Sequence, residues 1–496
     1  MSAPPATEPL APGGPPSLRD SMAAHGSGAI GGRWGRHAGV RRNGWWTPLR
    51  VLLAMTAFIM ALGFVQKAPC ANGDWTGSKQ YTHMCYSDVV PLWSDERLDI
   101  GAVPYRDTAV EYPALTGGFM WVTADLTRGV EAVKSDWTPV VIFGSLTALL
   151  LALCGLIVTA ATAQTARRRP YDAAIFALSP LLVFHAFTNW DLLAMALASC
   201  ALWAWSRSKP VAAGVFIGLG TAAKLYPAFL LVPVWILAIR TRRYAAALWA
   251  TAAAGVSWLT VNLPLALAYH HGWWAFYAFS NSRPAERSTI WAIGKTLADS
   301  GPDATDASYW VPPGAAVALA VIAAVLVVVW LGLNAPTKPR LAQLAFLIVL
   351  AFLITTKVWS PQYSLWLVPL LALARPRWKV NLVWQFTEIG VWFATLTLLL
   401  GLGTGQSAHG LPYGGLMIVL IARDLMLLTL AGLIVREMWR PELDVVRADG
   451  SDDPGGGPFD GAEDFYARLP RALDTDGAGP YVAIVSPGAP GPRNPH

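Results

Sequence analysis

The chain has 496 residues and a net charge of +6; 54% of its residues are hydrophobic and only 14% are charged. A soluble chain carries about 25% charged residues, so most of this surface does not face water. Apolar stretches of about 20 residues recur, each long enough to cross a bilayer. The composition excludes a soluble enzyme, an ordinary nucleic-acid binder and a secreted disulfide-stapled scaffold, and predicts an all-α polytopic membrane protein.

Residues 1–45 are rich in Gly, Pro, Ala and Ser and include the pair Arg41 and Arg42. A secretory signal would place an apolar core directly after a few positive charges. Because a long polar stretch comes first, we predict a disordered cytoplasmic N-terminal tail over 1–45, followed by an uncleaved membrane helix.

The predicted membrane domain, residues 46–440, contains about twelve transmembrane helices. The apolar runs that predict them lie at 49–67, 139–162, 171–187, 190–205, 211–223, 226–240, 244–268, 313–333, 341–356, 361–374, 380–400 and 412–435.

Arg and Lys cluster in alternate connections, and short positively charged loops stay in the cytoplasm. All clusters fall on one side if the helices alternate from a cytoplasmic N-terminus, so we predict a multi-pass protein of the cell membrane with both termini cytoplasmic. The large extracytoplasmic loops are then about 68–138 and 269–312. The clusters are Arg41/Arg42, Arg167–Arg169, Arg207/Lys209, Arg240/Arg242/Arg243, Lys338/Arg340, Arg375/Arg377/Lys379 and Arg436/Arg440.

The first extracytoplasmic loop contains Cys70 and Cys85, which outside the cytoplasm are free to form a disulfide. It also contains Asp88, Asp107 and Glu111. A carboxylate held close to the low dielectric of a membrane is a reasonable general base. The loop is therefore a candidate catalytic region.

Three tight turns on the same predicted face carry polar groups at membrane depth: Asn189–Asp191, Lys224–Pro227 and Lys357–Gln362. Such groups need partners or a functional cavity. Lysines on the outer face oppose the charge rule, although one alone could simply reach the interface. Together with Arg283 and Arg287, Lys224 and Lys357 are candidates to hold a phosphate. Candidates for contacts with a sugar or an acceptor are Tyr112, Asn189, Asp191, Tyr226, Gln362 and Tyr363.

No spacing of His and carboxylates matches a metal-ligand motif, and no nucleotide-binding glycine motif or nucleophile elbow occurs. We therefore predict no metal site and no cofactor. Whether a divalent metal is required is not readable from the sequence.

Residues 441–496 hold ten acidic residues and four Arg, so this segment carries −6. Its Gly-Pro runs disfavour packing. We predict a disordered, acidic cytoplasmic C-terminal tail.

The order of these motifs resembles the glycosyltransferase 87 family. The resemblance rests on an acidic first outer loop ending in Tyr-Pro (112–113), Asn-Trp-Asp-Leu-Leu-Ala (189–194), Lys-Leu-Tyr-Pro (224–227) and Ser-Pro-Gln-Tyr-Ser-Leu-Trp (360–366), and covers roughly 50–435. The usual Tyr-Pro-Pro is Tyr-Pro-Ala here.

The resemblance implies a GT-C fold and an inverting hexosyltransferase, a mannosyltransferase by type, that uses a polyprenyl-phosphate-linked sugar. The acceptor would be a lipid or cell-envelope glycan at the extracytoplasmic face. The catalytic carboxylate of the family lies in the first outer loop and matches Asp88 here, with Glu111 or Asp107 as alternatives. Lys224, Lys357, Arg283 or Arg287 would steady the departing phosphate.

The competing hypothesis is a transporter or flippase for a lipid-linked anionic substrate. It explains twelve helices and outer cations equally well. It explains a long acidic first loop less well, because transporters usually place binding groups near the membrane midplane.

Overall fold

The computed structural model describes residues 45–133, 136–299, 310–404 and 410–467. Residues 1–44 of the predicted N-terminal tail and residues 468–496 of the predicted C-terminal tail lie outside this range. Within it the chain is all-helical, as predicted, and the one β-bridge between Pro104 and Thr108 stands alone.

Six helices in the described part are long and apolar enough to cross a membrane, which makes the chain a polytopic membrane protein. They are α2 (Pro48–Lys67), α6 (Pro139–Thr165), α12 (Tyr244–Ala268), α15 (Gly314–Asn334), α18 (Trp378–Thr404) and α19 (Tyr413–Trp439).

Five shorter apolar segments complete the bundle, where the sequence predicted helices of similar span. Two of them begin with a 3₁₀ turn, Tyr226–Leu230 and Pro361–Trp366. The α-helices of the five are α9 (Asp191–Ser206), α10 (Pro210–Ala223), α11 (Leu231–Thr241), α16 (Leu341–Thr355) and α17 (Leu367–Ala374).

The helix predicted over 171–187 is wrong. The segment is divided into a 3₁₀ turn, α7 (Ala174–Ala177) and α8 (Pro180–His185). Pro180 lacks an N–H group, and a proline disfavours the helical region for the residue before it. Ser179 is accordingly extended, with φ −62° and ψ 121°, and Pro180 starts a new helix.

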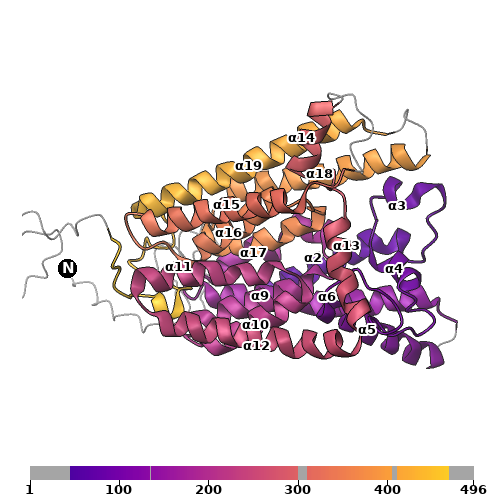
Figure 1. The fold of residues 1–496 in the computed structure, drawn as a ribbon, viewed down its shortest axis with the longest axis horizontal. Helices are drawn as coiled ribbons and strands as arrows, with labels where there is room; N and C mark the ends of the chain where they lie inside the picture. The colour runs from indigo at the N-terminus through magenta and orange to yellow at the C-terminus, as the bar shows by residue number, and fades with distance from the viewer. Residues whose placement is uncertain (1–44, 134–135, 300–309, 405–409, 468–496) are drawn as a thin grey trace, which may run out of the picture.

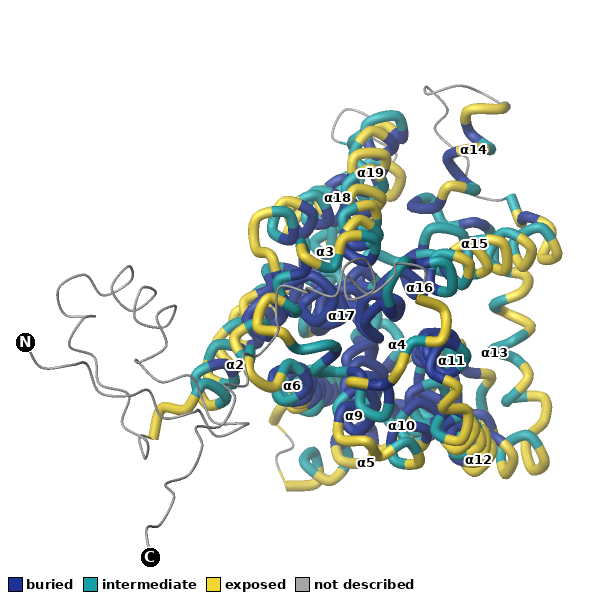
Figure 2. Tube along the Cα trace, turned by 90° about the vertical axis from the view of Figure 1, so that its left-hand side faces the viewer, coloured by how far each residue is buried: buried dark blue, intermediate teal, exposed yellow. Residues whose placement is uncertain are grey.

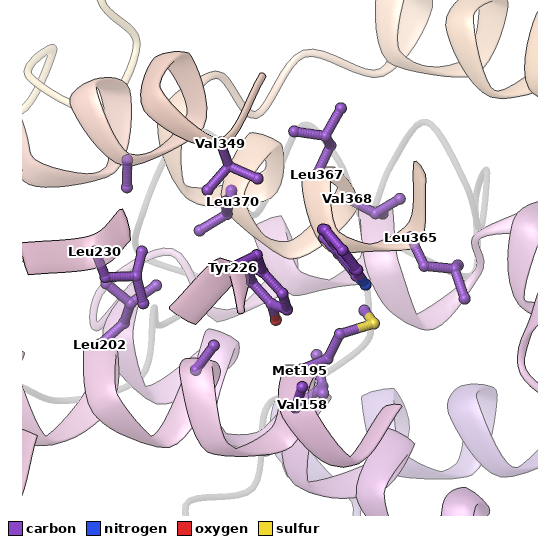
Figure 3. Packing of buried hydrophobic residues seen from close by; sticks show 14 of the residues in the cluster. Val158, Met195, Leu202, Tyr226, Leu230, Val349, Leu365, Leu367, Val368 and Leu370 are labelled. Carbon is purple, nitrogen blue, oxygen red and sulfur yellow. The ribbon is translucent and has the colours of Figure 1, made fainter. Parts of the chain in front are cut away.

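Helices α16 and α17 form the centre of the bundle (Figure 2). They are apolar on all sides, as expected for helices that contact protein all round. Figure 3 shows Tyr226 between Met195 of α9 and Leu370 of α17, so three segments far apart in sequence share one core.

Helices α10 and α12 approach closely because α10 has glycines at the contact. A Cβ added at Gly214 would lie 2.1 Å from the carbonyl oxygen of Ala250, and one at Gly218 would lie 2.0 Å from Oγ of Ser257. Small residues at such interfaces let backbones meet in membrane helices.

The described loops gather at two opposite ends of the bundle (Figure 1). One end, here called the first-loop end, carries α3 (Lys79–Thr82), α4 (Val89–Asp95) and α5 (Ala114–Val133). Helix α13 (His270–Ser282) runs across this end, roughly perpendicular to the long helices (Figures 1 and 2).

The opposite end, here called the arginine end, carries residues 441–467. The prediction of disorder is wrong for these residues, because they pack on the ends of the helices. Phe459 is 1% exposed and lies against the ring of Trp205, whose Nε1 donates to the Gly456 carbonyl at 2.9 Å.

The acidic residues of this segment neutralise the cations that the charge rule placed in the short loops. Arg340 donates twice to Asp444, from Nε at 2.6 Å and from Nη2 at 3.0 Å, and both side chains are buried. Other pairs join Arg168 to Asp449, Arg240 to Asp464 and Lys338 to Asp452. The composition of this segment indicated a solvated tail. Its ion pairs with the loop cations instead hold residues 441–467 against the helix ends.

Arg340→Met should destabilise the protein, because it leaves the buried carboxylate of Asp444 without its cation. Breaking a buried pair costs about 3–5 kcal/mol. The control is Arg168→Met, since its pair with Asp449 is largely exposed and such pairs contribute up to about 1 kcal/mol. Thermal unfolding in detergent measures both, and equal midpoints for the two variants would contradict the expectation.

Candidate functional site

A disulfide and two hydrogen bonds hold the start of the first loop at the end of α2. Cys70 and Cys85, the pair singled out in the sequence, form a disulfide with their Cα atoms 5.8 Å apart. Gln66 donates to the carbonyl of Met84 and Lys67 to that of Tyr86, each at 2.7 Å. The chain that leads into Asp88 is therefore held from the end of α2.

Asp88 is the residue before α4, but its side chain does not cap that helix. Its backbone N–H donates to the Thr188 carbonyl at 2.7 Å, and Oγ of Ser87 donates to the Phe187 carbonyl at 2.7 Å. These bonds place residues 87–88 beside the Asn189–Asp191 turn. The Asp88 carboxylate remains available for other contacts.

Two tyrosines contact the Asp88 carboxylate. Tyr112 donates to Oδ2 at 3.4 Å, and Tyr86 also hydrogen bonds it. Burial raises the pKa of Asp88, while the hydrogen bonds of the two tyrosines and the charge of Lys224 act in the opposite direction. A carboxylate with a raised pKa is a stronger base than an exposed one.

The tight turns meet beside Asp88. Nζ of Lys224 lies 2.9 Å from Oδ1 of Asp191, which is 2% exposed. The Asp191 N–H donates to Oδ1 of Asn189 at 3.0 Å, which fixes the start of α9. Oδ2 of Asp191 is buried, and no donor to it occurs among the described residues.

Aromatic rings enclose Lys224. Its Nζ lies 5.0 Å from the ring centres of both Tyr112 and Tyr363, within the range of cation–π attraction. Behind them Trp366 stacks on Tyr363 at 4.3 Å and on Tyr226 at 4.4 Å. The ammonium of Lys224 is thus held by one carboxylate and two ring faces.

A second group of charges joins the loops around Arg283 and Lys357. Nη2 of Arg283 lies 3.0 Å from Oε1 of Glu286, which also accepts a hydrogen bond from Ser360 at 2.7 Å. Lys357 donates to the carbonyl of Asn281 at 2.7 Å. Arg283 interacts electrostatically with Tyr112 and Tyr363, so this group borders the site that contains Asp88.

The other predicted residues are placed less centrally. Asp107 is exposed and paired with Arg106 at 2.8 Å; hydrogen bonding to Arg106 lowers its pKa to about 2, which makes it a weak base. The Glu111 side chain is exposed. Arg287 accepts a hydrogen bond from Tyr413 through its backbone carbonyl, and Gln362 is buried.

Sequence reasoning missed three residues near the site. Tyr86 precedes Asp88 by two positions, and a search for hydroxyl donors around the candidate base could have found it. Glu286 lies in the loop where only the arginines were considered. Lys67 ends the first membrane helix, where a lysine ordinarily reaches the interface.

Among the described residues, no three His, Cys, Asp or Glu side chains gather in a way that could hold a metal ion. The side chains around Asp88 and Asp191 form a cluster of two carboxylates, one lysine and several aromatic rings. Such a set suits sugar hydroxyls and the faces of sugar rings.

Glu96→Gln should stabilise the protein at alkaline pH. Glu96 is 4% exposed, accepts the Glu111 N–H at 3.2 Å, and burial raises its pKa to about 7. The unfolded carboxyl has a pKa of about 4.3, so the folded state loses stability as the pH rises from there to about 7.

Glutamine keeps the acceptor but carries no charge. Thermal unfolding should therefore show a higher midpoint for the variant at about pH 8 and nearly equal midpoints at about pH 4. Asp99→Asn, at an exposed carboxylate of the same loop, is the control and should shift the midpoint equally little at both. A gain from Glu96→Gln that is the same at both pH values would contradict the expectation.

Comparison with known proteins identifies the domain. The model of glycosyltransferase family 87 matches residues 135–361, a range that contains Asp191, Lys224, Arg283 and Lys357. Asp88 precedes that range. A search of curated proteins found no match. Residues 135–361 are therefore a glycosyltransferase family 87 domain, and the protein is a membrane glycosyltransferase.

Proposed function

We propose that the protein moves a hexose, specifically mannose, from a polyprenyl-phosphate-linked donor to a lipid or cell-envelope glycan acceptor, with inversion at the anomeric carbon. The observation that carries this proposal is the half-buried Asp88 carboxylate, contacted by Tyr86 and Tyr112 next to the Lys224–Asp191 pair. A base next to side chains that can bind a sugar is the minimum that such a transfer requires.

Asp88 removes the proton from the acceptor hydroxyl. The lone pair of that oxygen forms a bond to the anomeric carbon, while the bond from this carbon to the phosphate oxygen breaks. Polyprenyl phosphate leaves with the electron pair, and Asp88 keeps the proton. Because the leaving group is already activated as a phosphate ester, the reaction needs no ATP.

We assign the departing phosphate to Arg283, with Lys357 beside it and Arg287 as a further cation of the loop that contains Arg283. The Arg283 side chain is 35% exposed, so its guanidinium is accessible, and such groups bind phosphate in a bidentate manner. Arg283 and Lys224 are both paired with a carboxylate, but the Lys224 side chain is only 13% exposed, so we assign it to orienting Asp191. Oδ2 of Asp191, for which the described residues provide no donor, then accepts a hydrogen bond from a sugar hydroxyl.

We place the reaction at the extracytoplasmic face of the cell membrane, with both termini in the cytoplasm. Two observations support this. The Arg and Lys clusters of the short loops gather with residues 441–467 at one end of the bundle, and Asp88 lies at the other. Positive loops stay in the cytoplasm.

Asp88→Asn should abolish transfer from polyprenyl-phosphate-mannose to lipid acceptors by purified protein. Loss of a general base lowers the rate by about 10²–10⁴-fold, and the isosteric amide should leave the thermal midpoint near that of the unchanged protein. The controls are Asp107→Asn and Glu111→Gln, which should keep most activity. Full activity of Asp88→Asn would show that Asp88 is not the base.

Arg283→Gln should weaken use of the donor, because it removes the cation that we assign to the phosphate. We expect the KM for polyprenyl-phosphate-mannose to rise by about tenfold or more, since a charged hydrogen bond contributes about 1.5–3 kcal/mol. Arg106→Gln is the matched control, because Arg106 is half-exposed on the first loop and pairs with Asp107. Equal KM values for both variants would refute the assignment of Arg283.

A further inference from the structure

The last two residues of α2 hold the chain that carries Asp88, but they differ in charge. Gln66 donates to the carbonyl of Met84 and Lys67 to the carbonyl of Tyr86, each at 2.7 Å. Both bonds fix the same stretch of backbone. Only Lys67 brings a charge next to it.

The Lys67 side chain turns into the protein rather than toward the interface. The residue is 8% exposed, and Nζ lies 4.7 Å from the ring centre of Trp392 in α18. The same tryptophan ring forms a T-shaped contact with the ring of His185, which is 1% exposed and interacts electrostatically with Lys67. Neither ring nitrogen of His185 has a hydrogen-bond partner within the described chain.

A lysine at this depth is costly unless something offsets its charge. The ion pairs of the described residues do not include Lys67, whereas Lys224 is paired with Asp191. Lys67 instead interacts electrostatically with Asp88. In surroundings of low dielectric such an attraction acts over a longer distance than it does in water.

Several charged and titratable groups surround Asp88 and Lys67. Tyr86, Tyr112, Lys224 and Asp191 face Asp88, and His185 faces Lys67. Lys224, whose charge also favours the ionised form of Asp88, is paired with Asp191, whereas Lys67 takes part in none of the ion pairs of the described residues.

We propose that Lys67 is a positioning residue for the transfer reaction, which holds the backbone of Tyr86 and keeps the Asp88 carboxylate ionised when the acceptor hydroxyl arrives. The proposal rests on the proposed role of Asp88 as the base. It gives a specific role to a lysine that would otherwise only mark the end of a membrane helix.

The test is the pH dependence of kcat/KM for transfer from polyprenyl-phosphate-mannose. Lys67→Gln keeps a donor for the Tyr86 carbonyl but removes the charge, and Lys67→Arg keeps the charge. We expect the acidic limb of the profile to move to higher pH in Lys67→Gln and to stay in place in Lys67→Arg. A displacement by one pH unit lowers kcat/KM about tenfold on that limb.

Gln66→Leu is the matched control, because it removes a hydrogen bond of the same length from the same helix end without changing the charge. It should leave the acidic limb unchanged, whatever it does to the thermal midpoint. If Lys67→Gln lowers kcat/KM equally at every pH, Lys67 has only a structural role and the proposal is wrong.

Lys67→Met provides a second measurement of the limb if Lys67→Gln does not fold. The Asp88→Asn variant distinguishes a failure of the proposed base from a failure of the proposed role of Lys67. If Asp88→Asn is fully active, the proposed base is wrong. If Asp88→Asn is inactive while the limb is the same in Lys67→Gln and the unchanged protein, only the role of Lys67 is wrong.

Discussion

Buried charge is the constraint on which the rest of this structure depends. An ionised side chain away from water is stable only when an opposite charge or several hydrogen bonds replace its hydration. At the arginine end, Arg340 meets this condition with Asp444 and with the carbonyls of Leu373 and Ala374. At the first-loop end, Lys224 meets it with Asp191 and two tyrosine rings. Each group connects segments that are far apart in the sequence.

The two ends of the bundle differ in how completely their buried charges are paired. At the arginine end the cations are matched by acidic residues of 441–467, which leaves a set of ion pairs with a structural role. At the first-loop end the matching is incomplete. Within the described structure, Asp191 keeps one buried oxygen without a donor, and Asp88 is contacted by tyrosines rather than paired with an adjacent cation. A ligand or a proton can supply the missing partner of such a carboxylate. Carboxylates with incomplete pairing are typical of functional sites.

Much of the membrane domain could be predicted because apolar runs and charged loops are local features. Runs such as 139–162 and 244–268 became long helices, and the turns at 189–191 and 224–227 lie where the sequence interrupts its apolar pattern. The run at 171–187 failed because hydrophobicity does not register the effect of Pro180 on the backbone. The sequence also failed to predict that residues 441–467 are ordered. An acidic composition does not show which cations of the fold will form ion pairs with it.

The sequence by itself determined the class of protein, the carboxylates of the first loop and the outer lysines as candidates, and the resemblance that the family match then supported. The tertiary structure decided which of these residues meet. Asp88 comes to lie beside Asp191 and Lys224 because the Asp88 N–H and the Ser87 hydroxyl donate to the carbonyls of residues 187 and 188, a contact between positions a hundred residues apart. Asp107, equally acidic in the sequence, pairs with Arg106 instead. The physical reason is that the partner of a charge depends on distance in space, which no local pattern encodes.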